Sequence, residues 1–149
     1  MKIAIGSDHA GIRLKPVLME YLTQNGYEFK DFGTYTSDSC NYAEYGAQVA
    51  EAVASGEYDR GILICGTGIG MSIVANKVPG IRCAHCHDTF SAEATRLHND
   101  SNMIAFGERV ISADLMLEIV KLFLTTEFEG GRHIDRLNKI KEIENKYSK

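Results

Sequence analysis

The residues best suited to chemistry in this sequence are a cysteine and the glycine-rich turn after it, Cys65-Gly66-Thr67-Gly68-Ile69-Gly70. The apolar run Ile62–Ile64 before the turn predicts a strand that is buried on both faces of a parallel sheet. The apolar segment after it, 71–75, predicts a helix. A strand, a tight turn and a helix start direct several backbone N–H groups at one point, which can receive an anion or an oxyanion. Such N–H groups favour a thiolate, so we expect Cys65 to mark the reaction centre.

Other uses of this turn fit the sequence less well. A phosphatase of the Cys-x5-Arg type needs an arginine six residues after the cysteine, where this chain has Met71. The turn lacks the Lys-Ser/Thr pair of a nucleotide P-loop. Its G-x-G-x-G spacing also differs from the dinucleotide fingerprint, and no acidic residue ends the next strand. The plainer alternative is that Cys65 is an inert buried thiol.

Polar side chains follow two other predicted strands, and we expect them at the same edge of the sheet as Cys65. Asp8 and His9 follow the first strand, and Tyr42 follows the loop after the second. Asp8 could instead cap a helix, His9 could lie in a solvated turn, and Tyr42 could only pack a helix start. Their convergence with the Cys65 turn favours a pocket.

Basic residues gather later in the chain. His98-Asn99-Asp100 separates a predicted helix from a strand, and Arg109 lies just beyond that strand. Arg132, His133 and Arg136 follow Gly130-Gly131, and three cations beside a flexible turn suggest a phosphate clamp. A solvated helix face for Arg136, and a histidine that complements a helix dipole for His98, remain the alternatives.

The segment Cys83-Ala84-His85-Cys86-His87 matches the C-x-x-C-H pattern of haem attachment. Strand geometry points Cys83 and Cys86 to opposite faces, however, which suits neither haem nor a zinc site. We therefore expect a structural strand end here and no metal.

The elements that must position these residues alternate along the chain. We expect strands near 3–5, 27–32, 62–64, 81–85 and 103–106, with 27–32 near an edge and 81–85 in the core. Helical periodicity follows each strand, which predicts one α/β domain over residues 1–149 with a Rossmann-like, doubly wound, parallel five-stranded sheet. An extra C-terminal helix, about 134–147, carries an apolar stripe that we expect to pack on a partner subunit.

The bulk properties exclude several classes of protein. The net charge of −4 gives no reason to expect a nucleic-acid or membrane-surface partner. No stretch has the roughly 20 apolar residues of a membrane span, and the first residues do not resemble a signal peptide. We expect a cytoplasmic protein whose four cysteines are reduced.

Taken together, the motifs around Asp8, Cys65, His98 and Arg132 resemble those of the type B ribose-5-phosphate isomerases, a group that also contains the allose- and galactose-6-phosphate isomerases. The segments that carry the resemblance are Gly6–Gly11, Cys65–Gly70, His98–Asp100 and Glu129–His133. The resemblance covers nearly the whole chain. It implies a homodimer, often paired into tetramers, with no metal or nucleotide cofactor and with sites shared across the interface.

The resemblance also implies roles. Cys65 would move a proton between carbons 1 and 2 of a sugar phosphate, and Thr67 would relay hydroxyl protons. His98 would open the sugar ring, with Asp8 near the ring oxygen, and both His98 and Arg109 would reach across from the partner subunit. The expected substrate contacts are Asp8, His9, Tyr42, Gly66, Thr67, Gly68, Ile69, Gly70, Asn99, Arg109, Arg132 and Arg136.

One departure is visible. The group commonly has Asp-Tyr-Pro-Asp-Tyr where this chain has Asn41-Tyr42-Ala43-Glu44-Tyr45, which bears on loop rigidity and sugar preference. A hexose-6-phosphate isomerase is therefore the alternative enzyme. A sugar-phosphate sensor without activity is the alternative of another class, although it would not need Cys65 or His98.

Overall fold

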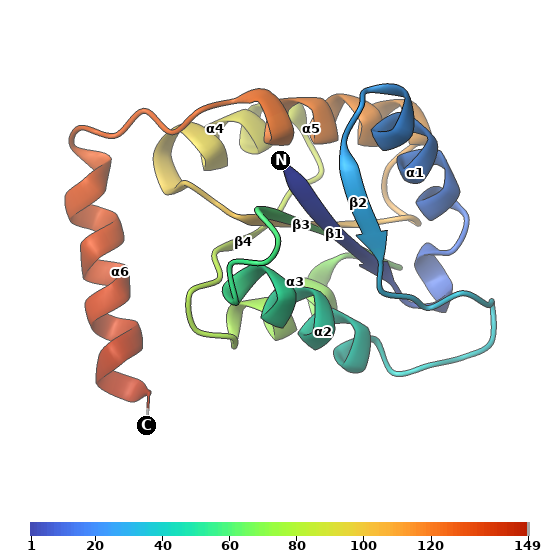
Figure 1. Ribbon diagram of the computed structural model, residues 1–149, viewed down its shortest axis with the longest axis horizontal. Coiled ribbons are helices and arrows are strands. Elements are labelled where there is room, and N and C mark those ends of the chain that lie inside the picture. The colour runs from blue at the N-terminus through green and yellow to red at the C-terminus, as the bar shows by residue number, and fades with distance from the viewer. Residues whose placement is uncertain (149) are drawn as a thin grey trace.

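The computed structural model describes residues 1–148 and shows one all-parallel sheet with helices on both faces (Figure 1). The strands are β1 (Lys2–Ser7), β2 (Glu28–Asp31), β3 (Arg60–Cys65), β4 (Cys83–His85) and β5 (Met103–Gly107). The helices are the short 3-10 turn η1 (His9–Gly11), α1 (Leu14–Gln24), α2 (Tyr42–Ala54), α3 (Ile69–Asn76), α4 (Thr89–Asn99), α5 (Ala113–Thr125) and α6 (His133–Tyr147). The strand order β2-β1-β3-β5-β4 confirms the predicted doubly wound sheet.

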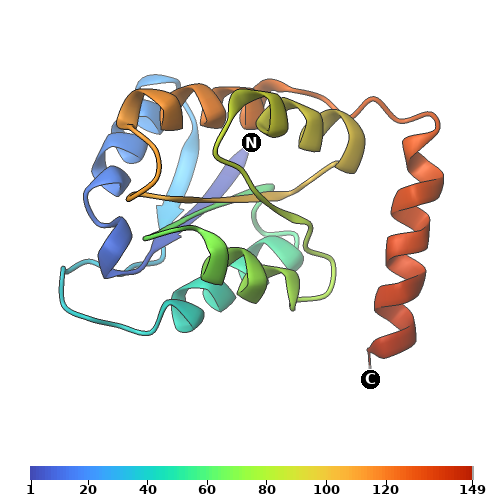
Figure 2. The ribbon, with the colours of Figure 1, turned by 180° about the vertical axis from the view of Figure 1, so that it is seen from behind.

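Two apolar layers hold the helices to the sheet. Helices α1, α4 and α5 cover one face, and α2 and α3 cover the other, as both views show (Figures 1 and 2). The central strand β3 alternates between the layers. Its Ile62 and Ile64 pack with Phe106 and Phe123 under α1 and α5, whereas Leu63 packs under α2 and α3. A strand buried on both faces explains the unbroken apolar run that the sequence shows.

One of the two edge strands agrees with its prediction and the other does not. β2 lies at an edge, as its polar sequence indicated. The expectation of a core strand over 81–85 was wrong, because β4 forms the opposite edge and begins only at Cys83. Ile81 N–H donates to the Val78 carbonyl and Arg82 N–H donates to the Asn102 side chain, so neither N–H group bonds to β5, although the Arg82 carbonyl accepts the Met103 N–H. Cys83 and Cys86 do pack into opposite layers, as predicted.

Helix α6 stands apart from the two layers and lies beside α4 (Figures 1 and 2). A hydrogen bond of 2.9 Å from the Gly80 N–H to Glu144 Oε1 ties it to the body. Its apolar side chains Ile134, Ile140, Ile143 and Tyr147 are about half exposed or more. Among the described residues, no helix is long and apolar enough to cross a membrane.

Candidate active site

A pocket of about 460 Å³ opens at the carboxyl ends of β1 and β3. These two strands are neighbours, so the turns after Ser7 and Cys65 meet at the same edge of the sheet, where open α/β folds bind ligands. The pocket is lined by Asp8, His9, Ala10, Tyr42, Cys65, Gly66, Thr67, Ile69, Gly70, Ile73 and Arg109. Of the residues predicted in the first 70 positions, all but Gly68 line this pocket, and Arg109 joins them.

The thiol of Cys65 ends β3 and is 5 % exposed. The N–H of Gly68 donates to its sulfur at 3.1 Å, which places a positive hydrogen where thiolate charge forms. Gly68 has a φ of 79°, and a Cβ there would lie 2.8 Å from the backbone of Phe106. Glycine is therefore required at this point, because both the left-handed backbone and the close approach exclude a side chain.

Helix α3 begins directly beyond the thiol. Its first N–H groups have no partner inside the helix, so the turn and the helix start together form an anion site. Thr67 Oγ1 accepts one of them, from Ile69 at 3.3 Å, which orients its hydroxyl at the pocket rim. The turn and the helix start therefore offer backbone N–H groups beside Cys65 that can receive an oxyanion.

Tyr42 forms one wall of the pocket. A Cβ on Gly70 would lie 2.6 Å from the Tyr42 ring, so this glycine allows the ring to pack directly against α3. Asn41 Oδ1 accepts the Ala43 N–H at 3.0 Å and caps α2 at this point. A proline at position 43 has no N–H, so here a hydrogen bond stabilises the loop in place of a rigid ring.

Asp8 and His9 form the floor on the β1 side. Asp8 is buried, and its carboxylate accepts the Ala10 N–H at 2.9 Å. It therefore caps η1 and lines the pocket, so the two predicted roles are compatible. His9 Nδ1 lies 3.3 Å from the Cys40 N–H, an arrangement that makes Nδ1 the acceptor and leaves Nε2 available to a ligand.

Arg109 approaches the turn from the end of β5. Its backbone N–H donates to the Gly66 carbonyl at 3.1 Å, and a Cβ on Gly66 would lie 3.1 Å from its guanidinium. Arg109 therefore lines the pocket of its own chain, whereas the resemblance implied a reach from the partner subunit. Its backbone anchor to Gly66 explains the difference.

The remaining predicted residues, His98, Asn99, Arg132 and Arg136, do not line this pocket. His98 and Asn99 end α4, which runs back across the sheet toward the amino ends of the strands. The segment after Asn99 lies at the amino end of β3, because the Gly61 N–H donates to the Asn102 carbonyl at 2.9 Å. Gly61 and Cys65 are separated by four residues, or about 13 Å along β3.

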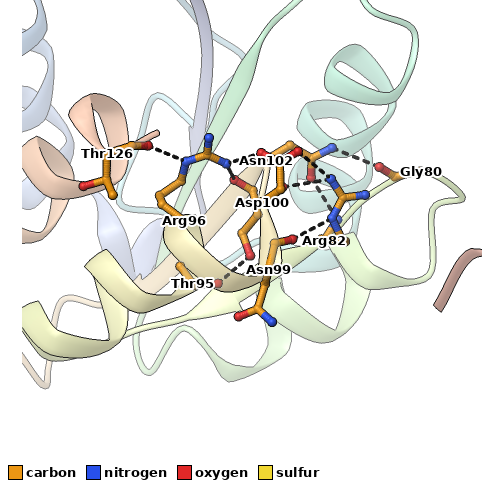
Figure 3. Close-up of polar contacts among 9 residues, drawn as sticks. Gly80, Arg82, Thr95, Arg96, Asn99, Asp100, Asn102 and Thr126 are labelled. Carbon is orange, nitrogen blue, oxygen red and sulfur yellow. Dashed lines mark hydrogen bonds and ion pairs between the residues drawn. The ribbon is translucent and has the colours of Figure 1, made fainter. Parts of the chain in front are cut away.

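Two arginines fix the turn that carries Asn99 (Figure 3). Arg82 donates to the Asn99 and Asp100 carbonyls at 2.9 and 2.8 Å. The buried Arg96 donates to the Asp100 carboxylate at 2.8 Å and to the Thr126 carbonyl at 3.1 Å. The Asn99 amide points away from this network, and among the described residues it has no hydrogen-bond partner (Figure 3). It is therefore available to a ligand.

His98 and His133 stack, with ring centroids 4.6 Å apart, and Glu129 lies 3.7–3.9 Å from both Nε2 atoms. These three residues have the composition of a metal site. Two arginines, Arg132 and Arg136, lie close to these residues, however. Desolvation, His98 and both arginines lower the pKa of His133, against an opposite effect of Glu129. The two arginines make this cluster a less favourable place for a cation.

Sequence reasoning missed two residues of the pocket, Ala10 and Ile73. Ala10 lies in η1 and contributes only a small apolar surface. Ile73 follows Ile69 by four residues on α3, so both lie on one helix face and form an exposed apolar rim. The i, i+4 spacing of these isoleucines was the signal that could have identified Ile73.

The cysteines differ in their expected reactivity. Burial, and the neighbouring Cys86, raise the pKa of Cys83 to about 12, and burial raises the pKa of Cys86 to about 11. Because the thiolate is the reactive form, Cys83 and Cys86 should resist alkylation at any pH well below these pKa values and react only in strong base.

At pH 8 we expect iodoacetamide to modify Cys65 and to leave Cys83 and Cys86 unmodified in peptide mapping. A ligand that fills the pocket should slow modification of Cys65, and equal rates with and without that ligand would contradict the place of Cys65 in the pocket.

The fold and this pocket define an α/β protein with a thiol beside an anion-binding turn at the carboxyl edge of its sheet. The profile of the ribose/galactose isomerase family matches residues 3–140, so the chain belongs to that family. The chain is 49 % identical to ribose-5-phosphate isomerase B of Escherichia coli (strain K12) over 143 residues, which cover 96 % of each chain.

Two further comparisons agree with this membership. D-erythrulose-4-phosphate isomerase of Pectobacterium atrosepticum is 46 % identical over 141 residues, 94 % of this chain and 93 % of the relative. The solved structure of ribose-5-phosphate isomerase B from Clostridium thermocellum is 57 % identical and superimposes with a TM-score of 0.98. The match covers 99 % of this chain and all of that one.

Proposed function

We propose that this protein is an aldose–ketose isomerase that interconverts ribose 5-phosphate and ribulose 5-phosphate through a cis-enediolate. The observation that carries the proposal is the Cys65 thiol, which accepts the Gly68 N–H inside a pocket that also contains His9 and Arg109. The chemistry needs a base and a site for oxyanion charge, and both are adjacent here. The isomerase names of the relatives support the proposal.

Each group then has a defined task. The Cys65 thiolate takes the proton from carbon 2 of the open aldose and returns it to carbon 1, which gives the ketose. The backbone N–H groups of the Gly66–Gly70 turn that are not bonded to Cys65 or Thr67 stabilise the enediolate oxygen, a contribution of about 3–4 kcal/mol for one such donor. Thr67 moves a proton between the two oxygens, and Asp8 and His98 act on the ring oxygen before the chemical step.

We propose that the phosphate is bound by His9, Arg109, Arg132 and Arg136. Their charge fixes the far end of the sugar and thereby orients carbons 1 and 2. Arg136 donates to the Arg132 carbonyl at 2.7 Å, so its guanidinium lies at the start of α6, next to the backbone of Arg132.

Arg136→Ala tests this phosphate clamp. The contact is similar in the ground and transition states, so we expect KM for the sugar phosphate to rise about tenfold or more while kcat changes little. Arg136→Lys keeps the charge, so its KM should lie between the values of the wild type and of Arg136→Ala. Steady-state kinetics measure KM and kcat for both variants. An unchanged KM would show that Arg136 lies on a solvated helix face and does not bind the phosphate.

We propose a homodimer that completes each site. His98 and Asn99 lie toward the amino ends of the strands, whereas Cys65 lies at a carboxyl end. One chain therefore does not bring them together, but a second chain related by twofold symmetry can. The half-exposed apolar side chains of α6 supply a surface for that partner. Dimers can pair further into tetramers.

The substrate test compares purified protein on ribose 5-phosphate, allose 6-phosphate and erythrulose 4-phosphate. We expect the highest kcat/KM for ribose 5-phosphate, which would support a role in the pentose phosphate pathway, whose reactions belong to the cytoplasm. A higher value for allose 6-phosphate would support the hexose alternative. Binding without turnover of any of the three would support a sensor.

A further inference from the structure

Two histidines outside the pocket lie near the Cys65–Gly70 turn, and one of them, His85, contacts it directly. His85 ends β4, and its Nε2 lies 2.7 Å from the Thr67 carbonyl oxygen. His87 follows two residues later, and its Nε2 lies 3.0 Å from the Gly107 N–H. The two rings meet edge to face, with centroids 4.6 Å apart and planes at 76°. Both belong to the C-x-x-C-H segment, for which neither metal nor haem chemistry was expected.

These contacts fix where each ring carries its proton. A carbonyl oxygen only accepts, so His85 Nε2 must carry a hydrogen and donate it. A backbone N–H only donates, so His87 Nε2 must be bare and its proton must lie on Nδ1. Burial and His85 lower the pKa of His87, against a smaller opposite effect of Asp88, which favours the neutral ring that this bond needs.

The Thr67–Gly68 peptide connects His85 to the thiol. Its carbonyl accepts from His85, and its N–H donates to Cys65 Sγ at 3.1 Å. A peptide is planar, so fixing the carbonyl also fixes the direction of the N–H. A donor on the carbonyl also polarises the N–H at the other end of the same unit, which strengthens its bond to sulfur.

The surroundings leave this peptide little freedom. A Cβ on Gly68 would lie 2.9 Å from His85 Cδ2, so the ring packs directly on the turn. On the other side, a Cβ on Gly107 would lie 2.6 Å from Thr67, and the Gly107 N–H is the group that His87 accepts. The turn is therefore enclosed between the end of β5 and the His85 ring.

We propose that His85 is a positioning residue for Cys65, which orients and polarises the Thr67–Gly68 peptide so that its N–H stabilises the thiolate, while His87 holds the His85 ring in place. The inference rests on the proposed role of Cys65 as the base. It assigns a function to a segment that the chemistry of the pocket otherwise leaves unused.

Two substitutions separate the donor from the ring. His85→Gln keeps an N–H at nearly the same reach, whereas His85→Phe keeps an aromatic ring against Gly68 and His87 but has no donor. We expect the Phe variant to lose roughly 3- to 10-fold in kcat, the effect of one hydrogen bond, with KM little changed. The Gln variant should retain most of kcat. Thermal unfolding of both variants checks that the fold persists.

A second readout does not depend on turnover. The pH profile for iodoacetamide modification of Cys65, followed by peptide mapping, should move to higher pH by about 0.5–1 unit in the Phe variant and stay near wild type in the Gln variant. The other ionisable groups that line the pocket, Asp8, His9, Tyr42 and Arg109, are the same in all three proteins. Equal profiles in the Phe and Gln variants would overturn the inference.

Nitrogen NMR of the histidine rings gives a direct check. We expect the Nε2–H tautomer for His85 and the Nδ1–H tautomer for His87 at neutral pH, and the reverse for His85 would overturn the inference. If the wild-type protein turns over no sugar phosphate, the proposed function fails. The alkylation profile and the tautomers still decide whether His85 acts on Cys65.

Discussion

Cys65→Ala should lower kcat for ribose 5-phosphate by about 10²–10⁴-fold, the range expected for loss of a positioned general base. The change removes the sulfur that accepts the Gly68 N–H, and none of the other pocket residues carries a thiol. Phosphate binding should persist, because His9 and Arg109 are unchanged. Coupled-assay kinetics and phosphate-protection experiments measure the two effects separately.

Cys83→Ala is the matched control. Cys83 begins the edge strand β4, does not line the pocket, and has a pKa raised to about 12, so it should remain a neutral thiol. We expect this variant to keep wild-type kcat. Substantial turnover by Cys65→Ala, with the control intact, would assign the base to another residue.

Mixing two inactive variants should restore activity. Cys65→Ala and His98→Ala chains are each expected to be inactive alone, because every site needs both residues and the structure places them toward opposite edges of the sheet. In a mixed dimer, the His98→Ala chain supplies Cys65 and the Cys65→Ala chain supplies His98 at one site. Random exchange makes about half of the dimers mixed, so activity should approach about one quarter of wild type.

The control for this experiment is Cys65→Ala mixed with Cys65→Ala that carries a different affinity tag. It should exchange subunits equally well and recover no activity. If subunit exchange is confirmed by mass and the two different variants recover nothing, each site is built from a single chain.

The carboxyl-edge pocket could be predicted from sequence because its parts are local. Strand periodicity placed Cys65 at the end of β3, and the parallel topology then brought Asp8 and His9 to the same edge. Both glycines also have a structural reason: Gly68 has a left-handed backbone, and Gly70 allows close packing of the Tyr42 ring. Each inference needed only the chain near the residue and one rule of sheet topology.

Other features depended on contacts between distant segments. Spacing alone did not show that the Arg109 backbone binds Gly66, or that β4 is a three-residue edge strand. The contacts of His85 and His87 were missed for the same reason. Their partners Thr67 and Gly107 lie 18 and 20 residues away and meet them only after the sheet forms.

The most direct test of the central claim is isomerisation in D₂O, followed by proton NMR over many turnovers. An enediolate formed by a thiol base exchanges its proton with solvent, so deuterium should enter carbon 1 of ribulose 5-phosphate and carbon 2 of the recovered ribose 5-phosphate. The Cys65→Ala variant should show neither. Conversion of the sugar with no deuterium at either carbon would contradict proton transfer through an enediolate, and with it the role of the Cys65 pocket.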